Sequence, residues 1–419
     1  MQLVFQFNIQ ENKAIHNMCL ASNNLYNQAL YIIKKEFNEN NKFLGFSQMD
    51  KIMKVTPNLD GEVNYYNLKA QTAQQILRLL EKNWKSYFKS IKDWKNHSEK
   101  YKGMPKPPGF RKSGDKHLII FTNQNSKIKE SELILSKDLT LDIPEYRGKD
   151  FTKFNQIRIL PRHKGYKVEI VYKQESLNCD LDILKYASID LGLNNLATMI
   201  STETKPIIFN GKIIKSYNQW YNKRKAKLCS IKDKMKIKSY TNQLYKIEED
   251  RECFINDYLH KVSKGIVQYC IENKISNLVC GHNNLWKDSI GLGKKTNQKF
   301  VNIPHSKLIS YLKYKCELVG INFIETEEAY TSKCDHFVFE EMEHQESYLG
   351  KRVKRGLFQS SVGKLLNADV NGALGILRKV VGDSGITQII NSGLLFNPVK
   401  IRNVFSISLQ NFNKNLLLN

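Results

Sequence analysis

The stretch Ser188-Ile-Asp-Leu-Gly-Leu-Asn-Asn-Leu-Ala-Thr-Met199 decides the fold of this chain. Its apolar runs predict one strand over 186–191 and a second strand over 196–200, with a turn at Gly192 between them. Asp190 therefore lies at the end of a strand, beside a glycine whose backbone freedom lets a bulky group approach. This arrangement predicts a functional site at the edge of a sheet.

A second carboxylate follows much later, in Asn367-Ala-Asp-Val-Asn-Gly-Ala373. From Asp369 onward, small and apolar residues recur at helical spacing, which predicts a helix that packs on the sheet and presents Asp369 at its edge. Mg²⁺ prefers carboxylate oxygens, and paired acidic groups can hold two ions that promote phosphodiester hydrolysis. Asp190 and Asp369 together predict an RNase H-like α/β nuclease domain that uses Mg²⁺, with Mn²⁺ as a possible substitute.

The charge of the chain indicates a polyanionic partner. Its 419 residues include 65 Lys and Arg but 41 Asp and Glu, a formal net charge of +24, and such an excess attracts nucleic acid. A lysine-rich, low-GC composition explains part of this excess, although the same bias also enriches glutamate. We expect no membrane partner and a cytoplasmic location, because the sequence has neither an apolar run of about 18 residues nor a signal peptide.

The eight cysteines are scattered, without any C-x-x-C pair. The sequence therefore predicts neither a disulfide framework nor a four-cysteine zinc site. Cys334 and His336 resemble the start of a metal knuckle, but further ligands are missing and zinc is not expected.

Strand and helix patterns predict a multidomain α/β chain. Several short strands between 118 and 172 indicate a small antiparallel barrel or sandwich, which the alternating segment 1–7 would close. Helical periodicity before residue 105 predicts an insertion, and the proline-rich and glycine-rich stretch 102–112 predicts a loop.

The nuclease domain is predicted to begin after Asp180. Besides the strands around Asp190, the patterns predict a further strand over 206–210 and a long charged helical region over 219–269. A buried strand over 277–280, a helix over 304–319 and a strand over 321–327 follow.

In combination, several motifs resemble the TnpB family, transposon-encoded RNA-guided nucleases related to the compact type V CRISPR effectors. The motifs are Gly103-Met-Pro-Lys-Pro-Pro108, the stretch 188–198, Tyr217-Asn218 with Trp220-Tyr-Asn-Lys223, Tyr330-Thr-Ser-Lys333, and Lys351-Arg-Val-Lys-Arg-Gly356 leading into 367–373. The resemblance covers nearly the whole chain. It implies guide-RNA-directed cleavage of double-stranded DNA beside a short transposon-adjacent motif, with a guide RNA derived from the transposon end.

The same resemblance implies a domain plan. A β-barrel (wedge) domain is expected over 1–14 and 106–180, with a helical recognition insertion over 15–105. A RuvC-like nuclease domain is expected over 181–400, and a C-terminal tail over 401–419.

Gly281 departs from the family pattern, in which a glutamate, the middle member of the RuvC triad, stands at this position. The end of the next strand offers Glu327 and Glu328 as replacements. Because side chains alternate along a strand, only one of the two would reach the metals, and we favour Glu327. The predicted catalytic and metal-binding set is therefore Asp190, Glu327 or Glu328, and Asp369. Alternatively, both glutamates are solvated and the nuclease is inactive.

A second departure lies before the final aspartate, where many family members carry two C-x-x-C pairs and this chain keeps only Cys334. We therefore expect residues 329–366 to form a metal-free lobe at the zinc-finger position, with a basic hairpin. The cations predicted to contact nucleic acid are Lys106, Arg111, Lys112, Lys287, Lys294, Lys295, Arg352, Lys354 and Arg355. Solvated charge is the competing interpretation.

Three functions are consistent with the sequence. The first is an RNA-guided DNA endonuclease, in which base pairing with the guide reads the target sequence. The second is a nuclease-dead RNA-guided DNA-binding repressor, a hypothesis to which Gly281 lends weight. The third, ranked last, is a DNA transposase or its accessory protein, because no feature singles out a nucleophilic tyrosine among the 20 in the chain.

Overall fold

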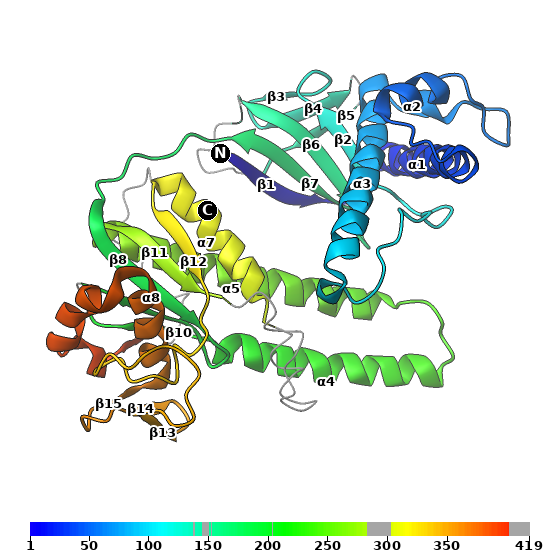
Figure 1. Cartoon of the computed structure of the whole chain (residues 1–419). Coiled ribbons are helices and arrows are strands. Elements are labelled where there is room, and N and C mark those ends of the chain that lie inside the picture. The colour runs from blue at the N-terminus through cyan, green and yellow to red at the C-terminus, as the bar shows by residue number, and fades with distance from the viewer. Residues whose placement is uncertain (137–138, 145–150, 152, 203, 283–302, 402–419) are drawn as a thin grey trace. The chain divides into compact units, whose positions relative to one another are not determined.

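The computed structural model describes residues 1–136, 139–144, 151, 153–202, 204–282 and 303–401. Contacts divide the chain into two compact units, Met1–Gln174 and Glu175–Asn419 (Figure 1). The finer domain limits expected from the sequence remain predictions. None of the helices in the described ranges combines the length and apolar character that crossing a membrane requires.

The first unit contains two antiparallel sheets. One has the order β1-β7-β6-β2 and is built from β1 (Gln2–Ile9), β2 (Ile119–Thr122), β6 (Phe154–Pro161) and β7 (Tyr166–Lys173). The other contains β3 (Lys127–Lys129), β4 (Glu132–Ser136) and β5 (Leu139–Asp142). Side chains of both sheets, among them Phe7, Leu133 and Ile157, belong to one buried cluster. Closure of these strands into a barrel remains a prediction.

Between β1 and β2 the first unit is helical. This part contains α1 (Lys13–Asn40), α2 (Phe46–Met53) and α3 (Ala70–Asn96), with short 3-10 helices at Asn64–Asn67 and Ser98–Lys100. The three helices share a hydrophobic core in which Ala73, Ile76 and Trp84 of α3 are buried. The helical periodicity of the sequence thus corresponds to real helices here.

The second unit is organised around a mixed sheet with the order β12-β11-β8-β9-β10-β16. Its strands are β8 (Asp182–Leu191), β9 (Asn195–Ser201), β10 (Ile207–Asn210), β11 (Ile275–Gly281), β12 (Asn322–Thr326) and β16 (Val399–Ile401). β8, β9 and β10 pair antiparallel, whereas β11 runs parallel to both β8 and β12. The carboxyl ends of β8, β11 and β12 therefore meet at one edge of the sheet.

Helices flank this sheet. α8 (Ala368–Asn391) packs on β8, β9 and β11, while α5 (Asn242–Glu272) packs on β11 and α7 (His305–Val319) on β12. The single helical region predicted over 219–269 is instead two helices, because α4 (Lys212–Lys234) ends before residue 235 and α5 begins after Thr241. Lys236 has a left-handed φ of 53° and Thr241 caps α5, which accounts for the break.

A small antiparallel sheet precedes α8. It consists of β13 (Lys351–Lys354), β14 (Leu357–Gln359) and β15 (Leu365–Asn367), and a short 3-10 helix, Leu394–Phe396, follows α8. The eight cysteines all lie in the described ranges, where none forms a disulfide, and five of them are buried.

Candidate active site

Asp190 lies one residue before the end of β8, opposite Thr198 of β9. The turn that follows is tight, because the Gly192 amide donates to the Leu196 carbonyl over 3.3 Å. A Cβ at Gly192 would lie 2.6 Å from the Asn195 carbonyl oxygen, so the turn requires glycine. His305, at the start of α7, places its Nε2 3.1 Å from the Gly192 carbonyl oxygen and braces the same turn.

Asp369 occupies the first turn of α8, as predicted. The Asn367 side chain caps this helix and accepts from the Asp369 amide at 2.9 Å. The Asp369 carboxylate accepts from the Asn195 amide side chain at 2.6 Å. One turn further along α8, a Cβ at Gly372 would lie 2.7 Å from Oδ2 of Asp190. The bare glycine therefore lets the strand-end aspartate approach the helix that carries Asp369.

Glu328, rather than Glu327, faces this site. β12 ends at Thr326, which pairs with Gly281 of β11, so the strand alternation on which the preference for Glu327 rested does not extend to these two residues. A Cβ at Gly281 would lie 3.3 Å from the Glu328 Cβ, whereas Glu327 is exposed. The Glu328 side chain thus starts next to the position that the Cβ of a residue other than glycine would occupy at 281.

The three carboxylates are electrostatically coupled. Burial, followed by the negative charges of Asp369 and Glu328, raises the pKa of Asp190 well above its ordinary value, and the nearby Arg352 guanidinium opposes this shift. Burial also raises the pKa of Glu328 to about 7, against the opposing charge of Lys379. Mutually repelling carboxylates of this kind are stabilised by a cation placed among them.

The donor set fits Mg²⁺ in type and charge, since Asp190, Glu328 and Asp369 supply carboxylate oxygens. With the side chains as they stand, however, no three His, Cys, Asp or Glu residues of the described ranges are grouped closely enough to hold a metal ion. The Asp369 carboxylate is turned toward Asn195. Metal binding by these residues is accordingly a proposal.

Gly281 has no room for a side chain. A Cβ there would lie 2.4 Å from Cδ1 of Ile376, a fully buried residue of α8. We expect Gly281→Ala to destabilise the protein by about 1–3 kcal/mol through overpacking, measured by urea unfolding. Gly103→Ala, at a glycine with nothing within 4 Å of its added Cβ, is the control and should change stability little. Equal stability of the two variants would contradict this packing.

The basic hairpin predicted near residue 351 is present. Arg352 and Lys354 lie on β13, Arg355 lies in the turn before Gly356, and all three cations are exposed. The positive charge of Arg352 also acts to lower the pKa of Asp190. Lys287, Lys294 and Lys295 lie outside the described residues.

In the first unit, the loop 102–112 presents Lys106, Arg111 and Lys112 to solvent. Asn27 of α1 holds this loop through two hydrogen bonds of 2.9 Å with the Arg111 backbone, and Asn23 donates to the Lys112 carbonyl at 2.9 Å. Lys106 lines a pocket of about 340 Å³, together with Tyr26, Asn83, Ser86, Tyr87, Ser90, Pro105 and Pro108. The loop is thus fixed, and its cations remain available.

Neutralising the hairpin by Arg352→Gln, Lys354→Gln and Arg355→Gln together should weaken nucleic-acid binding. The log–log salt slope of the affinity should flatten by about one unit for each phosphate that the variant no longer binds. A matched control removes Lys54, Lys85 and Lys261, which already pair with Asp50, Glu81 and Asp257, and should leave the slope nearly unchanged. If both triple variants behave alike, the hairpin cations are only solvated charge.

Sequence reasoning missed three residues that shape this site. Asn195 and Gly372 both lie inside the motifs that contain the two aspartates. The polar side chain of Asn195 and the small size of Gly372 were evident from the sequence, but no role was assigned to either residue. His305 begins a predicted helix more than 100 residues from Gly192, and nothing local to it indicates the contact.

Two family models and a viral protein match the sequence of this chain. The family model OrfB_IS605, described as probable transposase, matches residues 169–287, and the model Cas12f1-like, TNB domain matches residues 305–376. A protein of Acidianus two-tailed virus named TnpB-like protein ORF457 is 26% identical over 356 residues, which cover 76% of this chain and 74% of that protein.

A solved structure, the "Cryo-EM structure of the Cas12f1-sgRNA-target DNA complex", has a TM-score of 0.54 at 14% identity. The match covers 86% of this chain and 81% of that one. The mixed α/β fold is therefore similar to that of Cas12f1. The two family models and the viral relative together make this chain similar in sequence to TnpB-like proteins.

Proposed function

We propose that this protein is an RNA-guided DNA endonuclease with a metal-dependent RuvC site. The observation that carries the proposal is the convergence of Asp190, Glu328 and Asp369 from three separate elements on one edge of the sheet. The raised pKa values of Asp190 and Glu328 are typical of carboxylates in catalytic sites rather than on a solvated surface.

The topology supports the RNase H-like part of the proposal. Three antiparallel strands, β8 to β10, are followed in sequence by β11 and β12, which extend the sheet in parallel on the far side of β8. Asp190 stands on the central strand of this arrangement, and the helix that carries Asp369 packs across it. The sheet and α8 therefore define the separation of the two aspartates.

The carboxylates and the residues around them have different roles in the proposal. Asp190, Glu328 and Asp369 would hold Mg²⁺, which when bound supplies an activated water and stabilises the leaving oxygen of the phosphodiester. Asn195 orients the Asp369 carboxylate through its 2.6 Å hydrogen bond. Arg352, whose charge acts on Asp190, would bind the phosphate that is cleaved.

The proposed partners are a guide RNA, derived from a transposon end, and a double-stranded DNA target beside a short flanking motif. Similarity to TnpB-like proteins and the net charge of +24 support both partners. Base pairing with the guide would select the target, and the exposed cations of each unit would bind backbone phosphates.

A nuclease-dead repressor is the second candidate, and Gly281 is the observation that favours it. A repressor would keep the nucleic-acid contacts but would not cleave. The deciding experiment incubates the protein, loaded with the RNA that co-purifies with it, with a matching DNA target and Mg²⁺. Cleavage supports the endonuclease, whereas target binding without cleavage in Mg²⁺ or Mn²⁺ supports the repressor.

A further inference from the structure

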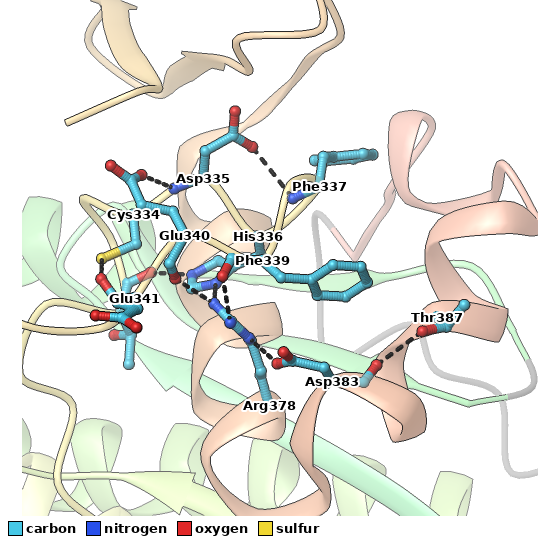
Figure 2. A network of polar contacts seen from close by, with 11 residues as sticks. Cys334, Asp335, His336, Phe337, Phe339, Glu340, Glu341, Arg378, Asp383 and Thr387 are labelled. Atoms are coloured by element: carbon cyan, nitrogen blue, oxygen red, sulfur yellow. Dashed lines mark hydrogen bonds and ion pairs between the residues drawn. The ribbon is translucent and has the colours of Figure 1, made fainter.

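The segment that follows Glu328 is fastened to α8 by hydrogen bonds (Figure 2). The buried Arg378 guanidinium donates to the carbonyl oxygens of Glu340 at 2.5 Å and Phe339 at 2.7 Å, and also to the Asp383 carboxylate. Nearer the start of α8, the Asn371 amide side chain donates to the Cys334 carbonyl at 3.0 Å. One face of the helix that carries Asp369 thus holds residues 334–340.

His336 lies inside this fastened segment. Its Nε2 is 2.7 Å from the Thr331 carbonyl oxygen, which can only accept, so Nε2 carries the hydrogen. Its Nδ1 lies 3.5 Å from Nη1 of Arg378, which can only donate. Both neighbours select the neutral ring with hydrogen on Nε2, and burial lowers the pKa of His336 to about 4, in agreement with a neutral ring.

α8 is shaped to receive this ring. A Cβ at Gly375 would lie 2.4 Å from Nε2 of His336 and 2.8 Å from the Thr331 Cβ. Gly375 therefore lets both His336 and Thr331 pack directly on the helix backbone. Gly375 lies between Asn371 and Arg378 at helical spacing, on the face of α8 that holds the segment.

Thr331 in turn fixes the backbone of Glu328. Its hydroxyl donates to the Glu328 carbonyl at 2.8 Å, and its amide donates to the same oxygen at 3.3 Å. β12 ends at Thr326, whose carbonyl accepts from the His282 amide at 2.9 Å. Glu328 lies two residues beyond the end of the strand. The turn closed by Thr331, and not the sheet, therefore orients the Glu328 backbone.

We propose that His336 is a positioning residue for Glu328, acting through the Thr331 carbonyl and held in place by Arg378 and Gly375. The proposal rests on the proposed function, in which Glu328 is a metal ligand. The backbone hydrogen bonds of a sheet fix the direction of a glutamate side chain on a strand. A glutamate in a turn needs other contacts to fix its direction. His336 supplies that support and ties Glu328 to the helix that carries Asp369.

The test compares His336→Leu with His336→Gln in the full-length chain loaded with guide RNA. Leucine removes the donor to Thr331, whereas the glutamine amide can restore it. Binding of Mn²⁺ is followed by the electron paramagnetic resonance signal of the free ion, and single-turnover cleavage and guided DNA binding are measured in parallel. We expect His336→Leu to weaken Mn²⁺ binding and cleavage by about 10–100-fold, as is typical when a metal ligand loses its supporting hydrogen bond.

DNA binding by His336→Leu should stay within about twofold of wild type, and His336→Gln should recover most of the loss. His260→Leu and His260→Gln are the matched controls, since His260 is half-buried and stacks on Tyr311 of α7, and they should leave Mn²⁺ affinity unchanged. Thr331→Val, which keeps the side-chain shape and removes the hydroxyl, should weaken Mn²⁺ binding even if His336→Leu does not fold.

Wild-type Mn²⁺ affinity in His336→Leu would overturn the proposal, and so would wild-type affinity in Thr331→Val. A parallel loss of Mn²⁺ affinity and DNA binding that glutamine does not recover would also overturn it, because it would indicate a purely structural histidine. Absence of cleavage by the wild-type protein would instead refute the proposed function, and the Mn²⁺ measurements would still decide the role of His336.

Discussion

Replacing Asp190 or Asp369 with alanine should abolish Mg²⁺-dependent cleavage of a guided DNA target and leave guide-RNA binding nearly intact. Each substitution removes a carboxylate from the coupled cluster without removing a cation from the nucleic-acid contacts. We expect the single-turnover rate to fall by at least about 10³-fold, which corresponds to roughly 4 kcal/mol of barrier. Gel-based cleavage and filter binding measure the two quantities on the same preparations.

Asp257→Ala is a suitable control for these variants. Asp257 lies on α5, where it pairs with Lys261 at 2.6 Å, and its loss should leave cleavage unchanged. Cleavage at the wild-type rate by either Asp190→Ala or Asp369→Ala would refute the proposed site.

The second large effect is expected at Glu328 and separates it from its neighbour. Glu328→Gln should reduce cleavage by at least about 100-fold, because the amide keeps the shape of the side chain but removes the charge that a metal ligand requires. Glu327→Gln should stay within about twofold of wild type, since Glu327 is exposed and is not among the charges that raise the pKa of Asp190. Single-turnover rates at saturating guide RNA provide the comparison.

The reverse pattern, with Glu327→Gln inactive and Glu328→Gln active, would show that the turn after β12 differs from the structure. Gly281→Glu should not rescue Glu328→Gln, because a side chain at position 281 meets Ile376 before it reaches the site. Rescue would mean that the family glutamate position is still usable in this chain.

Local patterns were enough to predict the elements that carry the two aspartates. The alternation around Asp190 and the helical spacing after Asp369 depend on neighbouring residues, and the structure places β8 and α8 accordingly. The sequence also predicted that the end of β8 and the start of α8 lie close together. A helix that packs on a sheet brings its first turn to the edge where the strand ends.

The sequence could not identify which glutamate faces the site. That outcome depends on where β12 ends and on the turn closed by Thr331, which in turn contacts His336 and α8. These contacts join residues through the tertiary structure, so the periodicity of the sequence around Glu328 does not predict them. The break between α4 and α5 was missed for a similar reason, since charged residues continue through 235–241 without proline or glycine to mark the interruption.

The central claim is that Asp190, Glu328 and Asp369 form a working nuclease site despite glycine at position 281. Its most direct test is to load the purified protein with its co-purifying RNA and to follow Mg²⁺-dependent cleavage of a DNA target that matches the guide, with Asp190→Ala alongside. The account predicts cleavage by the wild-type protein, none by the variant, and equal target binding by both. Target binding by the wild-type protein without cleavage in Mg²⁺ or Mn²⁺ would contradict it.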